Sequence, residues 1–166
     1  MIDRPVLVIG YGNSLRRDDG AGLILAQSLV HAWQTESLPV SLITDHQLNP
    51  ELADDIVRSG AQLVLFADAA AGAPGASIEA LPIPVPSLHE GLSPSLGHHV
   101  TPEVVLLYAR DLFGFRGHGW LLSIPGTDFD HGEGLSDATR TLVADFVRTQ
   151  SNDLWQRIHA AAGTTE

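Results

Sequence analysis

Three carboxylates and a pair of histidines are the side chains of this sequence best suited to hydrolytic or metal chemistry. The carboxylates are those of Asp18, Asp19 and Asp68. The histidines, His98 and His99, stand together before a segment with a helical pattern. Carboxylate oxygens and imidazole nitrogens suit a borderline divalent ion such as Ni²⁺ or Zn²⁺, and a carboxylate can take a proton from water. These residue types predict metal-assisted or carboxylate-based chemistry if the fold brings them together.

Each of these side chains also has an ordinary structural explanation. An acid before a helix caps it and stabilises it by about 1 kcal/mol, and this needs only one of Asp18 and Asp19. We expect Asp18 to be the N-cap of the helix that follows, and one of the two acids to have a functional role as well. Asp68 could equally cap a loop, and a histidine pair is usually solvated surface. A functional site therefore requires that these residues meet in space.

Other chemistries are excluded by residues that the chain lacks. Its 166 residues include no cysteine, which excludes disulfides, thiol nucleophiles and zinc–thiolate sites. All nine basic residues are arginine, so Schiff-base lysines and the P-loop lysine are excluded as well. The net charge of −11 argues against nucleic acid or an anionic membrane as a partner. No Gly-x-Ser-x-Gly elbow is present, and Leu15 stands where the dinucleotide fingerprint needs its third glycine.

Strand-like and helix-like segments alternate along the chain. Strands are predicted at residues 5–9, 40–44, 63–67, 77–83 and 118–124. Helices are predicted at residues 21–33, 49–60, 101–113 and 136–162. The link between the third and fourth strands is too short for a helical crossover, so the fourth strand is predicted to be antiparallel. Residues 82–97 contain four prolines and are expected to form a long surface loop.

This alternation predicts an α/β fold. We expect a three-layer α/β/α sandwich around a mostly parallel five-stranded sheet with one antiparallel strand, in a single domain spanning residues 1–166 whose last few residues fray. In such a sheet the carboxyl ends of the parallel strands meet at one edge, where ligands bind. The segments that follow the strands there are residues 10–19, 45–47 and 126–131, together with Asp68. The candidate carboxylates are therefore expected to share that edge.

The segment from residue 8 to residue 22 resembles a family signature. Its sequence, VIGYGNSLRRDDGAG, is similar to the opening motif G-x-G-N-x-L-x-x-D-[DE]-x-x-G of the nickel–iron hydrogenase maturation endopeptidases. The likeness continues through residues 46–51, residues 66–68, the histidine pair and residues 126–136, and so covers most of the chain. It implies the sandwich fold already expected, and a hydrolase that removes the C-terminal extension of a nickel-loaded hydrogenase large-subunit precursor.

The resemblance also implies which residues act. Its three metal-contacting residues fall on Asp19, Asp68 and His98, with His99 as the alternative to His98. The nickel would be supplied by the substrate precursor rather than permanently bound, and would report that metal insertion is complete. Water would be the nucleophile, and Asp18, Asp19 or Asp68 the catalytic base. Substrate contacts are expected from three loops at the same edge, through Gly10, Gly12, Asn13, His46, Gln47, Asp128 and His131.

The expected partner is the hydrogenase large-subunit precursor, with no nucleic acid and no membrane involved. The free chain is expected to be a monomer. A cytoplasmic location is expected because the first residues hold no basic segment followed by a cleavable apolar core.

Two alternatives from other functional classes would use the same edge of the sheet. One is a flavodoxin-like ligand-binding module without catalysis, which leaves the second acid and the histidine pair without a purpose. The other is a nickel-binding accessory protein, which predicts tight binding of metal by the isolated chain.

Overall fold

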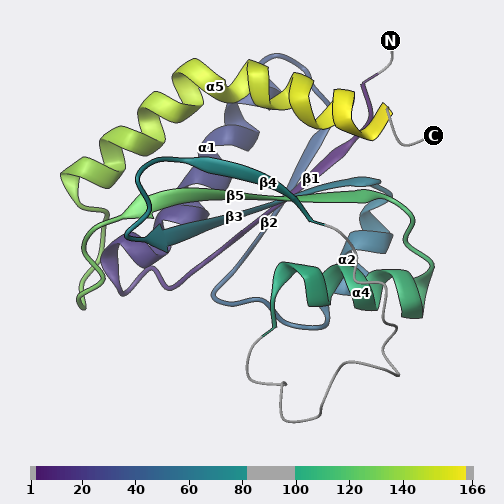
Figure 1. Cartoon of the computed structure of the whole chain (residues 1–166), viewed down its shortest axis with the longest axis horizontal. Coiled ribbons are helices and arrows are strands. Elements are labelled where there is room, and N and C mark those ends of the chain that lie inside the picture. Colours follow the sequence, from purple (N-terminus) through teal and green to yellow (C-terminus); the bar gives the residue numbers. More distant parts are fainter. Residues whose placement is uncertain (1–2, 82–99, 164–166) are drawn as a thin grey trace.

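The computed structural model describes residues 3–81 and 100–163 of the chain (Figure 1). The strands are β1 (Val6–Tyr11), β2 (Val40–Asp45), β3 (Leu63–Ala71), β4 (Ser77–Leu81) and β5 (His118–Gly126). The helices are α1 (Ala21–Thr35), α2 (Leu52–Ser59), α4 (Pro102–Phe113) and α5 (Asp137–Gly163), with a short 3-10 turn, η1 (Arg17–Gly20), before α1. All nine predicted elements are thus present, whereas the surface loop predicted at residues 82–97 lies outside the described residues.

The five strands form one sheet in the order β2-β1-β3-β5-β4. β1, β2, β3 and β5 run parallel to their neighbours, and β4 pairs antiparallel with β5. Only a short turn separates β3 from β4, which is too little chain for the helical crossover that a parallel strand needs. The predicted mostly parallel sheet with one antiparallel strand is therefore confirmed.

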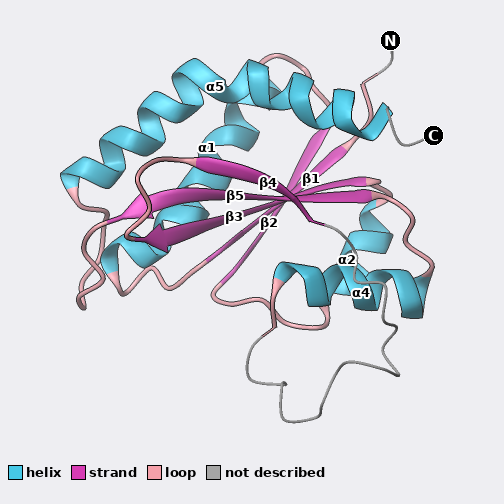
Figure 2. Cartoon of the chain, in the orientation of Figure 1, coloured by secondary structure: helices cyan, strands magenta, loops and turns pink. Residues whose placement is uncertain are grey.

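Helices cover both faces of this sheet (Figure 2). On one face α1 and α5 pack together, and Trp33 meets Trp155 edge to face with ring centroids 5.0 Å apart. On the other face α2 and α4 pack around Phe66. β3 is buried from both sides, which explains why its sequence is apolar without alternation. The three-layer α/β/α arrangement is therefore confirmed as well.

The last helix, α5, is the longest element, with 27 residues. Its buried residues, among them Val143, Leu154 and Ile158, pack on the sheet and on α1. Most of its exposed residues are polar, and Leu142 is an exposed apolar residue among them. Within residues 3–81 and 100–163, no helix combines the length and the apolar character needed to cross a bilayer.

Four strands extend beyond their predicted ends, by one residue in β2, by two in β1 and β5, and by four in β3. β1 continues to Tyr11, and β3 continues past Ala67 to Ala71, because β5 is long enough to pair with it over that whole stretch. Asp68 therefore lies inside a strand, paired in register with Ser123, rather than at the strand's mouth. A carboxylate inside a paired strand has a fixed backbone, which suits a residue that must present its side chain precisely.

The prediction that Asp18 caps α1 is wrong. Gly20 is the N-cap of α1, and no side-chain hydrogen bond caps this helix. Asp18 belongs to the 3-10 turn η1, which precedes the helix, and its carboxylate accepts hydrogen bonds from the β5–α5 loop instead.

Candidate functional site

A cleft of about 540 Å³ opens at the carboxyl ends of β1, β2 and β3, beside the first turn of α4. Five of the residues predicted from the sequence line it: Gly12, Asp19, His46, Gln47 and Asp68. They come from three separate segments of the chain, so the parallel sheet brings them together as its topology predicts. The other residues that line the cleft are Tyr11, Leu48, Val100, Thr101, Pro102, Glu103 and Leu121.

Asp68 is a half-buried acid that lines this cleft. Its Oδ1 accepts a hydrogen bond from the Ala69 backbone N–H at 2.7 Å, and its Oδ2 accepts one from the Tyr11 hydroxyl at 3.1 Å. Burial raises the pKa of Asp68, the two hydrogen bonds oppose that change, and the negative charge of Asp19 adds to it. Asp68 is thus a partly desolvated carboxylate with one donor at each oxygen.

Asp19 reaches the cleft from the turn η1. Its Oδ2 accepts a hydrogen bond from the Asn13 backbone N–H at 3.0 Å, which ties the turn to the preceding loop. The two segments touch at Gly12, whose φ of 148° favours glycine and where an added Cβ would overlap the Asp19 carbonyl oxygen. The Asn13 side chain accepts a hydrogen bond from Leu15 N–H at 2.9 Å and so shapes this loop. The glycine-rich motif therefore brings the backbone close enough to hold Asp19.

Asp18 has a different position from its neighbour. It is fully buried and is absent from the cleft lining. Its carboxylate accepts hydrogen bonds of 2.7–2.9 Å from the backbone N–H groups of Thr127, Asp128 and Ser136, and from the hydroxyls of Ser136 and Thr139. Burial by itself would raise the pKa of Asp18, but these donors outweigh burial and hold the pKa well below its usual range. Asp18 thus joins the β1–α1 loop to the start of α5.

The loop after β5 contacts Asp18 and does not line the cleft. Asp128 forms a 3.6 Å ion pair with Arg17, and Arg17 N–H donates to the Gly132 carbonyl. His131, next to Gly132, is exposed. Neither Asp128 nor His131 lines the cleft, so the structure does not bring these two expected substrate contacts together with Asp19 and Asp68.

Gly10 has a packing role. An added Cβ there would meet the Ala26 side chain and the Gly22 carbonyl oxygen, so its absence lets α1 lie close to β1. Gly10 is buried and does not line the cleft. Gly10 therefore serves the packing of α1 on the sheet and is not part of the cleft surface.

Two titratable residues of the cleft, Tyr11 and Glu103, were not predicted from the sequence as site residues. Tyr11 occupies the variable position between the two glycines of the first motif, and Glu103 looks like an ordinary acid in the first turn of a helix. Burial raises the pKa of Tyr11, and the negative charges of Asp68 and Glu103 raise it further, so this phenol stays protonated. The position of Tyr11 depends on the extension of β1 beyond its apolar run, and no signal in the sequence showed that extension.

No three His, Asp or Glu side chains in the described part of the chain group closely enough to hold a metal ion. Asp19 and Asp68 line the cleft as two oxygen donors, and His46 lines it as well. The third expected ligand, His98 with His99 as its alternative, lies outside the described residues. The described cleft thus offers two of the three expected ligands.

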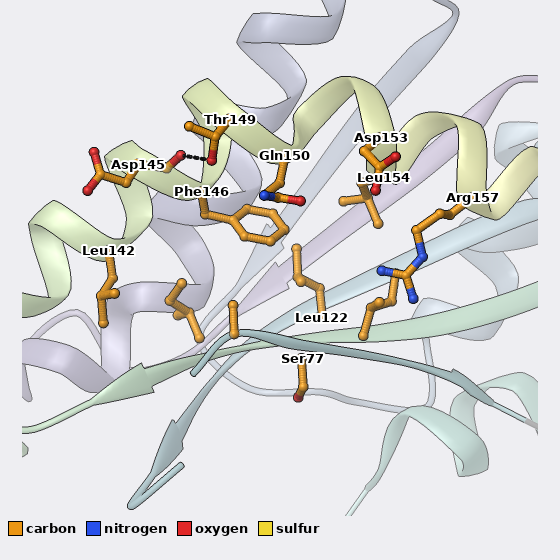
Figure 3. A pocket seen from close by; sticks show the side chains of 13 residues that line it. Ser77, Leu122, Leu142, Asp145, Phe146, Thr149, Gln150, Asp153, Leu154 and Arg157 are labelled. Carbon is orange, nitrogen blue, oxygen red and sulfur yellow. Dashed lines mark hydrogen bonds between the residues drawn. The ribbon is translucent and has the colours of Figure 1, made fainter. Parts of the chain in front are cut away.

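A second hollow, of about 360 Å³, lies on the opposite face of the sheet under α5 (Figure 3). Apolar side chains such as Leu122, Phe146 and Leu154 line it, and Arg157 extends from α5 toward the strands. None of the candidate site residues borders it. This hollow is therefore separate from the residues that were selected from the sequence.

Known proteins resemble this chain in fold rather than in sequence. No protein-family model matches the chain. No curated protein sequence matches it significantly either. Solved structures do resemble it. The similarities described next are all below 25% identity, so they establish the fold and nothing finer.

One similar structure is the [NiFe] hydrogenase maturation protease HycI from Thermococcus kodakarensis KOD1, with a TM-score of 0.65 and 20% identity over 90% of this chain and 91% of that chain. Another is the hydrogenase maturating endopeptidase HybD from E. coli, with a TM-score of 0.59 and 16% identity over 92% and 93% of the two chains. A third is hydrogenase 2 maturation peptidase from Thaumarchaeota archaeon SCGC_AB-539-E09, with a TM-score of 0.58 and 21% identity over 91% and 98%. The chain therefore has the α/β fold of the hydrogenase maturation proteases, as its first motif implied.

Proposed function

We propose that this chain is an endopeptidase that removes the C-terminal extension of a nickel-loaded hydrogenase large-subunit precursor. One observation carries the proposal. In a fold shared with hydrogenase maturation proteases, Asp19 of the signature motif and Asp68 of β3 line the same cleft. These are the positions on which the resemblance places two of the metal-contacting residues.

In this proposal nickel belongs to the substrate. Asp19 and Asp68 supply oxygen donors, and His98 or His99 supplies a nitrogen donor, a set that suits a borderline divalent ion. Docking of the precursor's nickel against these side chains would make metal insertion a condition for cleavage. The isolated chain would then bind the ion weakly, because three donors in an open cleft leave the coordination shell incomplete.

The reaction is the hydrolysis of one peptide bond. A carboxylate accepts a proton from water, the resulting hydroxide attacks the carbonyl carbon, and the carbon–nitrogen bond breaks after the proton passes to the leaving amine. Of the three acids considered for the base, Asp18 is buried outside the cleft lining and accepts hydrogen bonds from six donor groups. Asp19 and Asp68 therefore remain as candidates for the base. Gly12, His46 and Gln47 line the same cleft and would contact the scissile segment.

The proposal extends to the setting of the reaction. We expect the enzyme to act as a monomer in the cytoplasm on the folded precursor, without nucleic acid or a membrane. Light scattering of the purified chain tests the monomer. A stable dimer would contradict this part of the proposal and leave the chemistry untouched.

The deciding experiment compares nickel-loaded with nickel-free precursor as the substrate. Mass spectrometry should detect a released C-terminal peptide from the loaded precursor and none from the nickel-free form. His98→Ala and His99→Ala, tested separately, identify the third ligand as the variant that loses cleavage. An intact loaded precursor would overturn the proposal. A copurified flavin or nucleotide would then favour the ligand-binding module, and tight binding of Ni²⁺ by the isolated chain would favour the accessory protein.

A further inference from the structure

Tyr11 lines the cleft and forms a side-chain hydrogen bond with Asp68. Its hydroxyl donates a 3.1 Å hydrogen bond to Asp68 Oδ2, and its ring packs against the core cluster on the α2/α4 face of the sheet. The phenol is therefore held at its ring end by apolar packing and at its oxygen by the carboxylate. Neither group can turn without breaking that contact.

The sheet register makes this contact a fixed feature of the fold. Gly10 of β1 pairs with Ala67 of β3, so Tyr11 and Asp68 are the next residues along two adjacent parallel strands. Their side chains project to the same face as Ile9 and Phe66, which belong to the α2/α4 core cluster. The hydrogen bond thus joins neighbouring side chains on two paired strands.

The contact also determines which lone pairs of the Asp68 carboxylate stay available to other partners. Oδ1 is held by the Ala69 backbone N–H and Oδ2 by Tyr11, one donor at each oxygen. Each carboxylate oxygen has a second lone pair, and Asp68 lines the cleft. Because both oxygens are held by a hydrogen bond, the carboxylate has a fixed orientation, and its remaining lone pairs have a fixed direction relative to the cleft.

We propose that Tyr11 is a positioning residue for Asp68, fixing the orientation in which that carboxylate meets the substrate. This inference rests on the proposed function, because it concerns the same cleft and the same reaction. Tyr11 acts through Asp68, so its hydroxyl should affect the catalytic step rather than the binding of the precursor. A phenylalanine would fill the same space in the core and leave the Asp68 carboxylate free to rotate.

The chain offers a matched control, since it contains two tyrosines. Tyr108 lies on α4 and lines a different hollow, between α2 and α4, with Pro50 and Glu51. Tyr108→Phe removes the same oxygen atom away from the cleft. Tyr11→Phe should lower kcat for loaded precursor about tenfold, the size expected for one hydrogen bond to a charged group, with KM unchanged. Tyr108→Phe should leave both constants at the wild-type values.

A second measurement needs no activity. Urea unfolding of the wild type, Tyr11→Phe, Asp68→Ala and the double variant forms a thermodynamic cycle. Tyr11→Phe should lower the unfolding midpoint when Asp68 is present and leave it unchanged in the Asp68→Ala background. Wild-type kcat in Tyr11→Phe, an equal loss in Tyr108→Phe, or the same midpoint shift in both backgrounds would overturn the inference. If the wild type fails to cut the precursor, the proposed function fails, while the cycle still decides whether Tyr11 holds Asp68.

Discussion

Asp18 and Asp68 are both carboxylates removed from bulk water, and their surroundings are opposite. Asp18 is fully buried and accepts hydrogen bonds from three backbone N–H groups and from the Ser136 and Thr139 hydroxyls, so its pKa lies well below the usual range. Asp68 has two donors, and burial raises its pKa. The two carboxylates thus differ in the number of hydrogen-bond donors around them. The saturated acid holds the structure together, and the acid with lone pairs to spare is available to a substrate.

The contrast is sharper between adjacent residues. Asp19 follows Asp18 directly, yet Asp19 lines the cleft and Asp18 is absent from its lining. The 3-10 turn η1 carries both residues and directs them to different sides. Adjacent acids thus serve two purposes, one holding the β5–α5 loop and one facing the cleft.

The largest expected effect is on activity. Asp68→Ala and Asp19→Ala should each lower the cleavage rate of loaded precursor by about 10³-fold, since in the proposed function each variant lacks a metal ligand or the catalytic base. Asp68→Ala should leave the free energy of unfolding near its wild-type value, because removing a desolvated carboxylate offsets the two lost hydrogen bonds. The measurements are peptide release and urea unfolding.

A matched control for these two variants is Asp153→Ala, which removes an exposed acid on α5 outside the cleft. It should cleave at the wild-type rate. Full activity of Asp68→Ala would remove Asp68 from the site and end the contrast with Asp18.

The second effect is on stability. Asp18→Asn keeps the shape of the side chain, removes its charge and turns an NH₂ group toward hydrogen-bond donors, so it should lower the free energy of unfolding by about 3 kcal/mol. Urea unfolding monitored by circular dichroism measures this loss. Asp145→Asn, an exposed acid that pairs with Arg148 on α5, should change stability by less than about 0.5 kcal/mol. Equal stability of Asp18→Asn and the wild type would show that Asp18 is not an anchor.

The smallest effect separates the donors of Asp18. Thr139 is buried, and its hydroxyl donates to Asp18 Oδ2 at 2.8 Å. Thr139→Val removes that donor with little change of shape and should lower the free energy of unfolding by about 1 kcal/mol. Thr139→Ser keeps the hydroxyl and should recover part of the loss. A valine variant as stable as the wild type would mean that the other donors already satisfy Asp18.

Much of the fold could be predicted from the sequence because the signals were local. The apolar run at residues 63–67 predicted a strand, and the short link between the third and fourth strands predicted an antiparallel neighbour. The strand ends could not be predicted in the same way. Whether β3 continues past Ala67 depends on the length of β5, which lies far along the chain and supplies the backbone partners.

The candidate site, like the fold, was predictable where the signals were local and unpredictable where distant segments meet. The sequence by itself indicated chemistry by carboxylates and histidines. Its first motif selected Asp19, and the end of the third predicted strand selected Asp68, because residue types and short spacings are local properties of the chain. Only the tertiary structure decided that Asp18 turns inward to the start of α5, that Asp128 and His131 lie outside the cleft, and that Tyr11 reaches Asp68. Burial and hydrogen-bond partners arise from segments distant in the sequence, and they decide which of several similar acids is free to react.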